Sequence, residues 1–143
     1  MTDPKTIKIE ATIAAPLPKV WTHWTSPEHI TKWNFAVEDW HCPRATNDLR
    51  AGGKYTARME AKNGSFGFDF EGIYDEVVPQ ARLRYTMADG RTVATDFVKV
   101  GDQTRVTSVF VAESQNSEER QRGGWQSILD RFKKYVEASA ARA

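Results

Sequence analysis

The segment that decides the fold lies near the C-terminus and reads Gly123-Gly124-Trp125-Gln126-Ser127-Ile128-Leu129-Asp130-Arg131-Phe132. Its large apolar residues recur at the spacing i, i+3, i+4 and i+7, so they share one face of a helix. These residues are Trp125, Ile128, Leu129 and Phe132. The spacing predicts the start of one long amphipathic helix that runs to the C-terminus, with Asn116 or Ser117 as its N-cap.

The glycine pair Gly123-Gly124 stands near the first turns of this helix, where each glycine costs about 1 kcal/mol relative to alanine. One interpretation is that the helix begins after the pair, or that another part of the backbone packs closely against it. The other is that the missing side chains widen the entrance to a pocket beside Trp125. Alanine at both positions would then reduce ligand uptake more than stability.

Upstream of the helix, from about Trp40 to Phe110, the chain is predicted to form successive antiparallel strands. Five turn signals separate runs of strand length and imply six strands. These signals are Gly52-Gly53, Asn63-Gly64, Pro79-Gln80, Asp89-Gly90 and Gly101-Asp102. Within the runs apolar and polar residues alternate, as in strands with one buried face. The inward set includes Phe66, Phe68, Phe70, Tyr74, Leu83, Tyr85, Met87, Val93, Thr95 and Phe97.

The chain before these strands adds one strand and two short helices. Apolar and polar residues alternate over residues 7–13, which predicts a strand. Helical spacing follows over residues 17–24, and a helix-start proline opens a second brief helix over residues 27–33. We therefore expect an α+β fold, a single domain over residues 1–143, in which a curved antiparallel sheet of about six to seven strands surrounds the C-terminal helix.

A curved sheet that surrounds a single helix tends to leave a pocket between the two. The residues predicted to line this pocket are large, apolar or aromatic, as small-molecule sites usually are. They are Trp33, Tyr55, Met59, Phe68, Phe70, Tyr85, Phe97, Trp125 and Leu129. Tyr85 is the first candidate for a hydrogen bond to a ligand, and Tyr55, Tyr74 and Thr95 are further polar groups that would orient a carbonyl or hydroxyl.

The composition argues against several classes of partner. Lys and Arg total 20 against 19 Asp and Glu, a formal charge of +1, so no overall field attracts nucleic acid or an anionic membrane. No stretch approaches the about 20 apolar residues that a membrane span needs, and the N-terminus lacks a signal-peptide core. The single cysteine, Cys42, suits a reducing compartment. We expect a cytoplasmic protein.

The residues that carry most enzymatic chemistry are not arranged for it in the sequence. None of the histidines His23, His29 and His41 has the spacing of a metal site, and Cys42 is predicted to be a buried, inert thiol. No Gly-x-Ser-x-Gly motif is present. The carboxylates of Asp69 and Glu71 share the outer face of a strand, where Arg58, Arg82 or Arg84 would be their neighbours. We expect no catalytic residue, no metal and no cofactor.

Several local strings, spread over nearly the whole chain, resemble the helix-grip superfamily of START lipid-transfer domains and polyketide cyclases. They match most closely the branch similar to the C-terminal domain of the activator of heat-shock protein 90 ATPase. The strings are Ile13-Ala14-Ala15-Pro16 with Val20-Trp21 and Trp24, Leu49 to Tyr55, Gly72 to Val77 with Leu83 to Thr86, Thr104 to Thr107, and Gly124-Trp125 before Leu129. The resemblance implies the helix-grip fold with two short helices after the first strand. It carries over no catalytic motif.

These observations lead to three hypotheses about function. The preferred one is a binding protein that holds a hydrophobic or aromatic small molecule, such as a lipid, polyketide or flavonoid-like compound, between sheet and helix. The second is a cyclase- or hydrolase-type enzyme that uses the same cavity, with Tyr85, Arg58 or His41 brought inward by a bulge. The third is a protein-interaction module akin to the chaperone activator. A homodimer is compatible with all three, and the sequence does not decide it.

Overall fold

The computed structural model describes residues 5–35, 38–114 and 116–141, with the side chains of the last helix described up to residue 138. The strands are β1 (Thr6–Ile13), β2 (Trp40–Asn47), β3 (Lys54–Ala61), β4 (Gly67–Val78), β5 (Arg82–Met87), β6 (Thr92–Val100) and β7 (Gln103–Val111). The helices are α1 (Leu17–Thr25), α2 (Pro27–Trp33) and α3 (Glu118–Ala141). These elements confirm the predicted α+β class, the strand number and the two short helices after the first strand.

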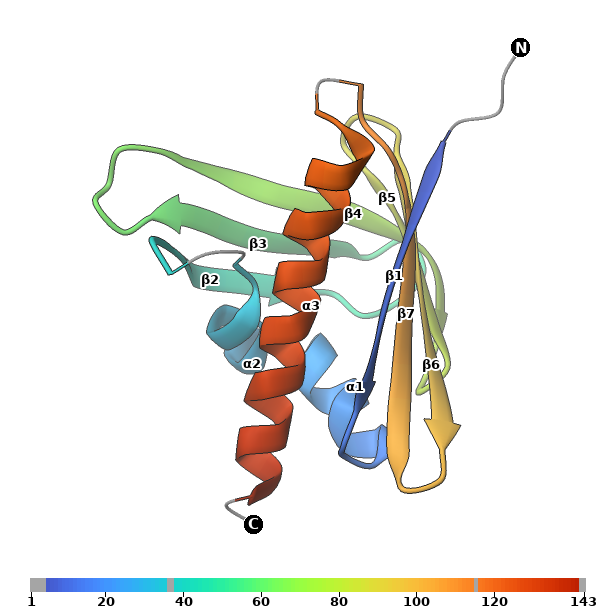
Figure 1. Ribbon diagram of the computed structural model, residues 1–143. Coiled ribbons are helices and arrows are strands. Elements are labelled where there is room, and N and C mark those ends of the chain that lie inside the picture. The colour runs from blue at the N-terminus through green and yellow to red at the C-terminus, as the bar shows by residue number, and fades with distance from the viewer. Residues whose placement is uncertain (1–4, 36–37, 115, 142–143) are drawn as a thin grey trace.

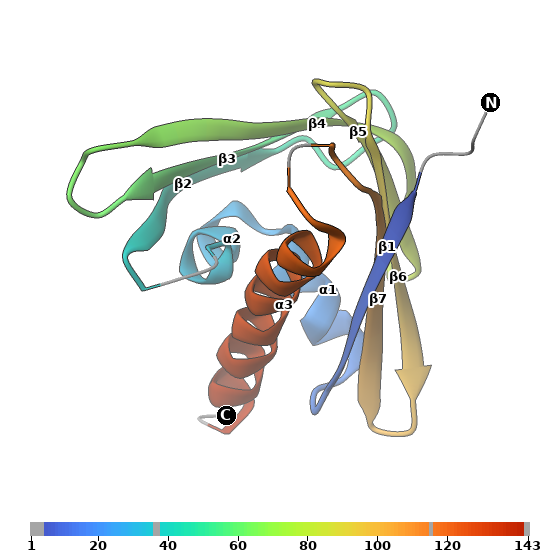
Figure 2. The ribbon, with the colours of Figure 1, turned by 45° about the horizontal axis from the view of Figure 1, so that its top comes forward.

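The seven described strands form one antiparallel sheet in the order β1-β7-β6-β5-β4-β3-β2. Strands β2 to β7 are a meander in which each strand pairs with its neighbour in sequence, and β1 adds to the far edge beside β7. The sheet curls around α3, which crosses its concave side, while α1 and α2 lie on that side toward the C-terminal end of α3 (Figures 1 and 2). The predicted turns all fall between strands.

Helix α3 begins at Glu118, because the Oγ atom of Ser117 accepts a hydrogen bond of 3.1 Å from the Arg120 amide. Ser117 is therefore the N-cap, one of the two predicted candidates. Gly123 and Gly124 lie inside the helix, in its second turn, and not before it. A Cβ atom built on either glycine meets nothing within 4 Å, apart from the helix's own neighbouring backbone. Neither the later helix start nor close backbone packing explains the pair.

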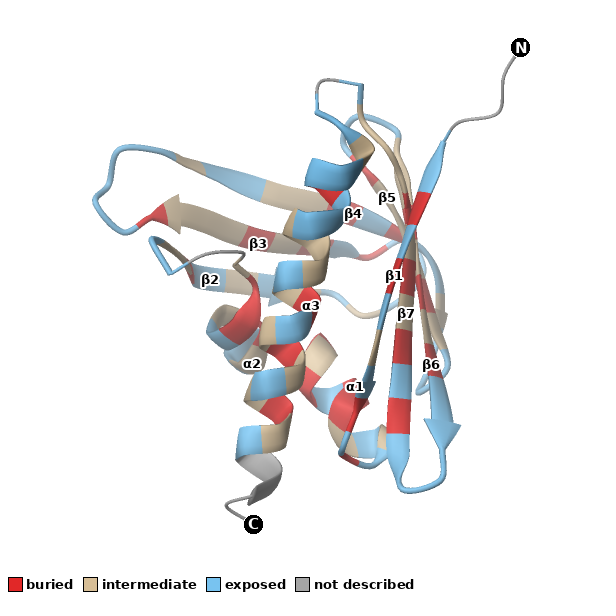
Figure 3. Ribbon diagram, in the orientation of Figure 1, coloured by how far each residue is buried: buried red, intermediate tan, exposed pale blue. Residues whose placement is uncertain are grey.

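The C-terminal half of α3 forms a closed core with α1 and α2. The Phe132 ring is fully buried and meets the rings of Trp24 and Trp33 edge-on, at centroid distances of 4.9 and 4.8 Å. The rings of Trp24 and Trp33 stack on each other at 4.9 Å. Leu129 and Val136 are buried on the same face of α3. Figure 3 shows buried and exposed positions following one another along this helix. The three helices are therefore tightly packed together at this end of the molecule.

Charged side chains cover the convex face of the sheet. Asp69 lies 3.5 Å from Arg58 and Glu71 lies 2.8 Å from Lys54, measured between nitrogen and oxygen atoms. The outward orientation predicted for both carboxylates is confirmed, and Arg58 is the predicted neighbour that Asp69 meets. Exposed ion pairs contribute at most about 1 kcal/mol each to stability. These contacts therefore add little to the stability of the fold, and they mainly make the convex face hydrophilic.

Candidate functional site

A cavity of about 860 Å³ lies between the N-terminal half of α3 and the concave face of the sheet. Most residues of its wall are apolar or aromatic, and they come from all seven described strands and all three described helices. Eight of the nine residues predicted to line it do so: Trp33, Tyr55, Met59, Phe68, Phe70, Tyr85, Trp125 and Leu129.

Phe97 is the predicted wall residue that does not reach the cavity. It points to the concave side of β6, as its parity requires, but it lies two residues beyond Thr95, toward the end that α1 covers. There its ring meets Trp21 edge-on at 5.2 Å and Trp24 at 5.8 Å. Packing against α1 therefore takes Phe97 into the closed core.

Aromatic rings from four elements meet over the middle of the cavity. The ring of Tyr85 on β5 lies 6.0 Å from Tyr55, 6.1 Å from Tyr74 and 6.1 Å from Phe70. The Trp125 ring on α3 lies 6.1 Å from Phe70. Edge-to-face contacts at these separations hold neighbouring rings in definite orientations. The aromatic side chains of the wall therefore hold one another in a defined arrangement.

The ring of Tyr85 owes its position to Gly72 on β4. A Cβ atom at residue 72 would lie 2.4 Å from Cδ2 of Tyr85, far inside contact distance. The ring therefore rests on the bare backbone of β4, which only a glycine allows. This close approach explains why a glycine interrupts the run of large inward residues between Phe70 and Tyr74.

The polar groups of the interior are hydroxyls and amides. The Tyr55 hydroxyl accepts a hydrogen bond from Asn34 (2.6 Å), and the Tyr74 hydroxyl donates one to Oδ1 of Asn47 (2.7 Å). Burial raises the pKa of Tyr55, Tyr74 and Tyr85 well above the usual tyrosine value, with a smaller contribution from neighbouring tyrosines at Tyr55 and Tyr85. All three phenols stay neutral at physiological pH.

Charged residues that line the cavity come from one edge of it. Among the described residues these are Arg91, Glu113 and Arg120, from the turn before β6, the loop after β7 and the first turn of α3. The buried Gln121 fastens this edge, because its side chain accepts from the Glu113 amide (2.9 Å) and donates to the carbonyl of Asn116 (2.8 Å). Sequence reasoning missed Arg91 and Glu113 because they lie in loops, which have no periodicity. It missed Arg120 and Gln121 because it searched the apolar stripe of the helix, and these polar residues precede that stripe.

Three aromatic side chains form an exposed cluster at the outer end of the cavity. Trp40 lies 5.9 Å from Phe66 and 6.0 Å from Phe68, between ring centroids. Phe66 is 63% exposed and Phe68 is 41% exposed. Both were predicted on the inward face, and they do line the cavity, but the β3–β4 hairpin projects past α2 and α3 (Figures 1 and 2). None of the helices that the structure describes covers that end of the inward face.

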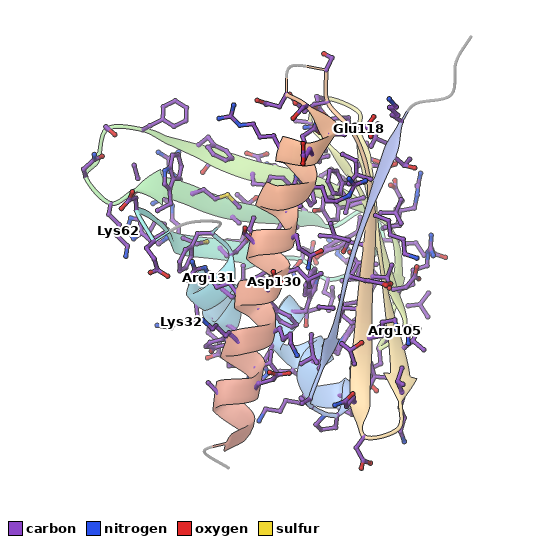
Figure 4. The ribbon with its side chains drawn as sticks, in the orientation of Figure 1. Lys32, Lys62, Arg105, Glu118, Asp130 and Arg131 are labelled. Carbon is purple, nitrogen blue, oxygen red and sulfur yellow. The ribbon has the colours of Figure 1, made fainter. Side chains whose placement is uncertain are left out.

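Arg131 ties α3 to the segment that follows α2. Its Nε atom donates to the Phe35 carbonyl (3.1 Å), and its guanidinium lies 4.4 Å above the centre of the Phe35 ring. A second nitrogen of Arg131, which is labelled in Figure 4, donates to Glu38 at 2.8 Å. Because Phe35 lines the cavity, this contact positions part of its wall.

Of the three residues considered for catalysis, Tyr85 lines the cavity, whereas Arg58 and His41 do not. Arg58 pairs with Glu60 and Asp69, and neither it nor His41 is among the lining residues. Cys42 is buried, as predicted, and burial raises the pKa of its thiol to about 11, so the nucleophilic thiolate is scarce at neutral pH. In the described residues no three His, Cys, Asp or Glu side chains gather in a way that would hold a metal ion.

Two histidines pack together between α1, α2 and α3. The rings of His23 and His29 stack at 4.1 Å, Nδ1 of His23 donates to the Lys19 carbonyl (2.8 Å), and Nδ1 of His29 lies 2.7 Å from the Tyr135 hydroxyl. Burial lowers the pKa of His23, and the charges of His29 and Lys19 add to this effect.

Because His23 is buried, we expect the fold to lose stability in acid. Because folding lowers the pKa of His23 below its unfolded value of about 6.5, the unfolded chain binds more protons, and stability is lost as the pH falls through that value. The urea midpoint should therefore decline from pH 7 to pH 5 in the wild type and decline less in His23→Gln. Equal slopes in the two proteins would count against this assignment.

A long C-terminal helix held by a curled antiparallel sheet, with a cavity between them, defines a START-like, helix-grip protein. The family profile of activator of Hsp90 ATPase homolog 1-like proteins matches residues 14–137, and the chain belongs to that family. No curated protein matches the chain. Within the described residues, no helix is long and apolar enough to cross a membrane.

Solved structures agree with this assignment. The AHSA1-like protein of Aeromonas hydrophila is 42% identical, with 95% of this chain and 94% of that chain covered and a TM-score of 0.90. A protein of Cytophaga hutchinsonii is 44% identical, with 96% of each chain covered and a TM-score of 0.81. A Nitrosomonas europaea protein, 22% identical with 94% and 95% covered and a TM-score of 0.82, shares the fold.

Proposed function

We propose that the protein binds a hydrophobic or aromatic small molecule in the cavity between α3 and the sheet. The observation that carries this proposal is the cavity itself, whose volume of about 860 Å³ falls within the range of small-molecule sites. Its wall is mainly apolar and aromatic, so binding would remove apolar surface of both the wall and the ligand from water, at about 25 cal/mol per Å². Lipids, polyketides and flavonoid-like compounds are all of this class.

The residues proposed to contact the ligand come from the described wall. They are Trp33, Tyr55, Met59, Phe68, Phe70, Tyr85, Trp125 and Leu129. The arrangement supports binding over catalysis, because the three charged lining residues lie at one edge and Arg58 and His41 are outside. An enzyme needs an acid, base or nucleophile beside the reacting atoms.

Titration with the neutral fluorophore N-phenyl-1-naphthylamine tests the proposal. We expect a saturable rise in fluorescence with one site per chain and a dissociation constant in the micromolar range. Val98→Ser is the control, because Val98 is an exposed apolar residue of the convex face and its loss should leave the titration unchanged.

Absence of saturable uptake at micromolar protein would contradict a ligand-binding cavity. The exposed cluster of Trp40, Phe66 and Phe68 would then favour the alternative of a protein-interaction module, since exposed aromatic patches are common features of partner-binding surfaces.

A further inference from the structure

The Tyr85 hydroxyl is an unused hydrogen-bond donor on the cavity wall. No hydrogen bond to it is found among the described residues, whereas the phenols of Tyr55 and Tyr74 each have an amide partner. Its ring is held in place by contact with the backbone at Gly72 and by the surrounding aromatic rings. A donor in this position is fixed in space before any ligand arrives, which lowers the entropic cost of using it.

A second unused donor lies nearby, in a pair of hydroxyls. Thr95 on β6 and Ser108 on β7 are 2% and 3% exposed, both line the cavity, and their side-chain oxygens lie 2.8 Å apart. Two hydroxyls carry two protons, and only one of these makes the bond between them. The other proton has no acceptor among the described residues, so the pair keeps one donor for a guest.

The two donors occupy adjacent rows of the sheet. In the register of β5, β6 and β7, Leu83 lies beside Thr95 and Thr95 beside Ser108, while Tyr85 lies beside Val93 in the next row of the same face. Rows of one face are two residues apart, about 7 Å along the strand. A flat molecule of two or three fused rings that lies against this wall therefore spans both donors.

The positions of the charged lining residues determine whether a neutral or an ionised ligand is favoured. The charged lining residues among those described, Arg91, Glu113 and Arg120, lie at the edge formed by the loop after β7 and the start of α3. The wall around Tyr85, Thr95 and Ser108 offers neutral hydroxyls only. Burying an ionised group there without a counter-charge carries a large desolvation cost.

From these contacts we infer that the cavity selects neutral, flat aromatic molecules that carry a carbonyl oxygen, which accepts a hydrogen bond from Tyr85 or from the Thr95–Ser108 pair. This inference rests on the proposed function and narrows its ligand class. Purely hydrocarbon ligands enter the same space, but they leave the donors unpaired, which lowers their affinity relative to a matched ketone.

The test compares fluorene with 9-fluorenone, two molecules of the same ring system that differ in one carbonyl group. Each displaces N-phenyl-1-naphthylamine, and the ratio of their dissociation constants is measured in every protein. Because the ketone is more soluble in water, the informative quantity is how this ratio changes between proteins. In Tyr85→Phe/Thr95→Val/Ser108→Ala the preference for the ketone should fall about fivefold to tenfold from its wild-type value.

Two further variants help to interpret the change in ketone preference. Tyr85→Phe alone removes one oxygen atom and should reduce the preference about threefold, even if the triple variant folds poorly. Tyr135→Phe is the control, because its hydroxyl lies outside the cavity and contacts His29, so the ratio should not change. Thermal denaturation of each variant checks that it is folded.

The possible outcomes separate the two proposals. If both compounds bind and their affinity ratio is the same in the wild type, Tyr85→Phe and the triple variant, the ketone selectivity is overturned while the binding function stands. If neither compound nor the fluorophore binds the wild type, the proposed function itself fails.

Discussion

Phe132→Ala is expected to lower the free energy of unfolding by about 3–5 kcal/mol, the largest effect of any single side chain considered for this protein. The ring is fully buried and meets Trp24 and Trp33 edge-on, at 4.9 and 4.8 Å. Alanine would leave a void among side chains of three different helices, which cannot close without moving all of them. Urea denaturation followed by tryptophan fluorescence measures the loss.

Phe66→Ala is the matched control for this prediction. It removes the same ring from a site that is 63% exposed, at the tip of the β3–β4 hairpin, so the expected change is within about 0.5 kcal/mol. Similar losses for the two variants would show that the closed core around Phe132 does not govern stability.

The second large effect concerns the glycine pair of α3. Gly124→Leu is expected to weaken binding of N-phenyl-1-naphthylamine by roughly tenfold or more, because residue 124 lines the cavity and a leucine there occupies its entrance. Gly123→Leu places the same side chain one residue earlier in the same helix. Because Gly123 is not among the lining residues, its substitution should leave the affinity unchanged.

Both glycine variants should become more stable, by up to about 1 kcal/mol each, because leucine favours a helix more than glycine does and neither site is crowded. Thermal denaturation and fluorophore titration measure the two quantities on the same samples. A ligand affinity that falls equally in both variants, or in neither, would contradict the interpretation that Gly124 keeps the entrance open. Greater stability combined with weaker binding at residue 124 alone would support it.

Much of the fold was readable from local patterns. The alternation of Phe68, Phe70 and Tyr74 identified the inward face of β4, and five turn signals located the boundaries of six strands. The sequence also identified eight of the residues that line the cavity, because a residue's face on a strand or helix follows from its position in the repeat. Ser108 was within reach of the same reasoning, since it shares the parity of Val106 and Phe110 on a strand that was predicted.

The local patterns did not predict how far the cavity extends along each strand. Phe97 and Thr95 have the same parity on β6, yet α1 packs over Phe97 and leaves Thr95 on the cavity wall. Phe68 and Phe70 share a face of β4, but only Phe70 lies under α3, close to Trp125, while Phe68 is 41% exposed. These differences depend on which distant segment covers each residue.

The sequence by itself determined the class of fold, the alternation of β1, the inward faces of β4, β5 and β6, and the apolar stripe of α3, because these depend on repeats of two and 3.6 residues that local sequence encodes. Only the tertiary structure decided where helix and sheet close together around Phe132 and where they separate into a cavity. It also decided that the Tyr85 ring rests on Gly72 and that its hydroxyl finds no hydrogen-bond partner within the described part of the chain. Contacts between segments far apart in the chain set these features, and no local repeat records them.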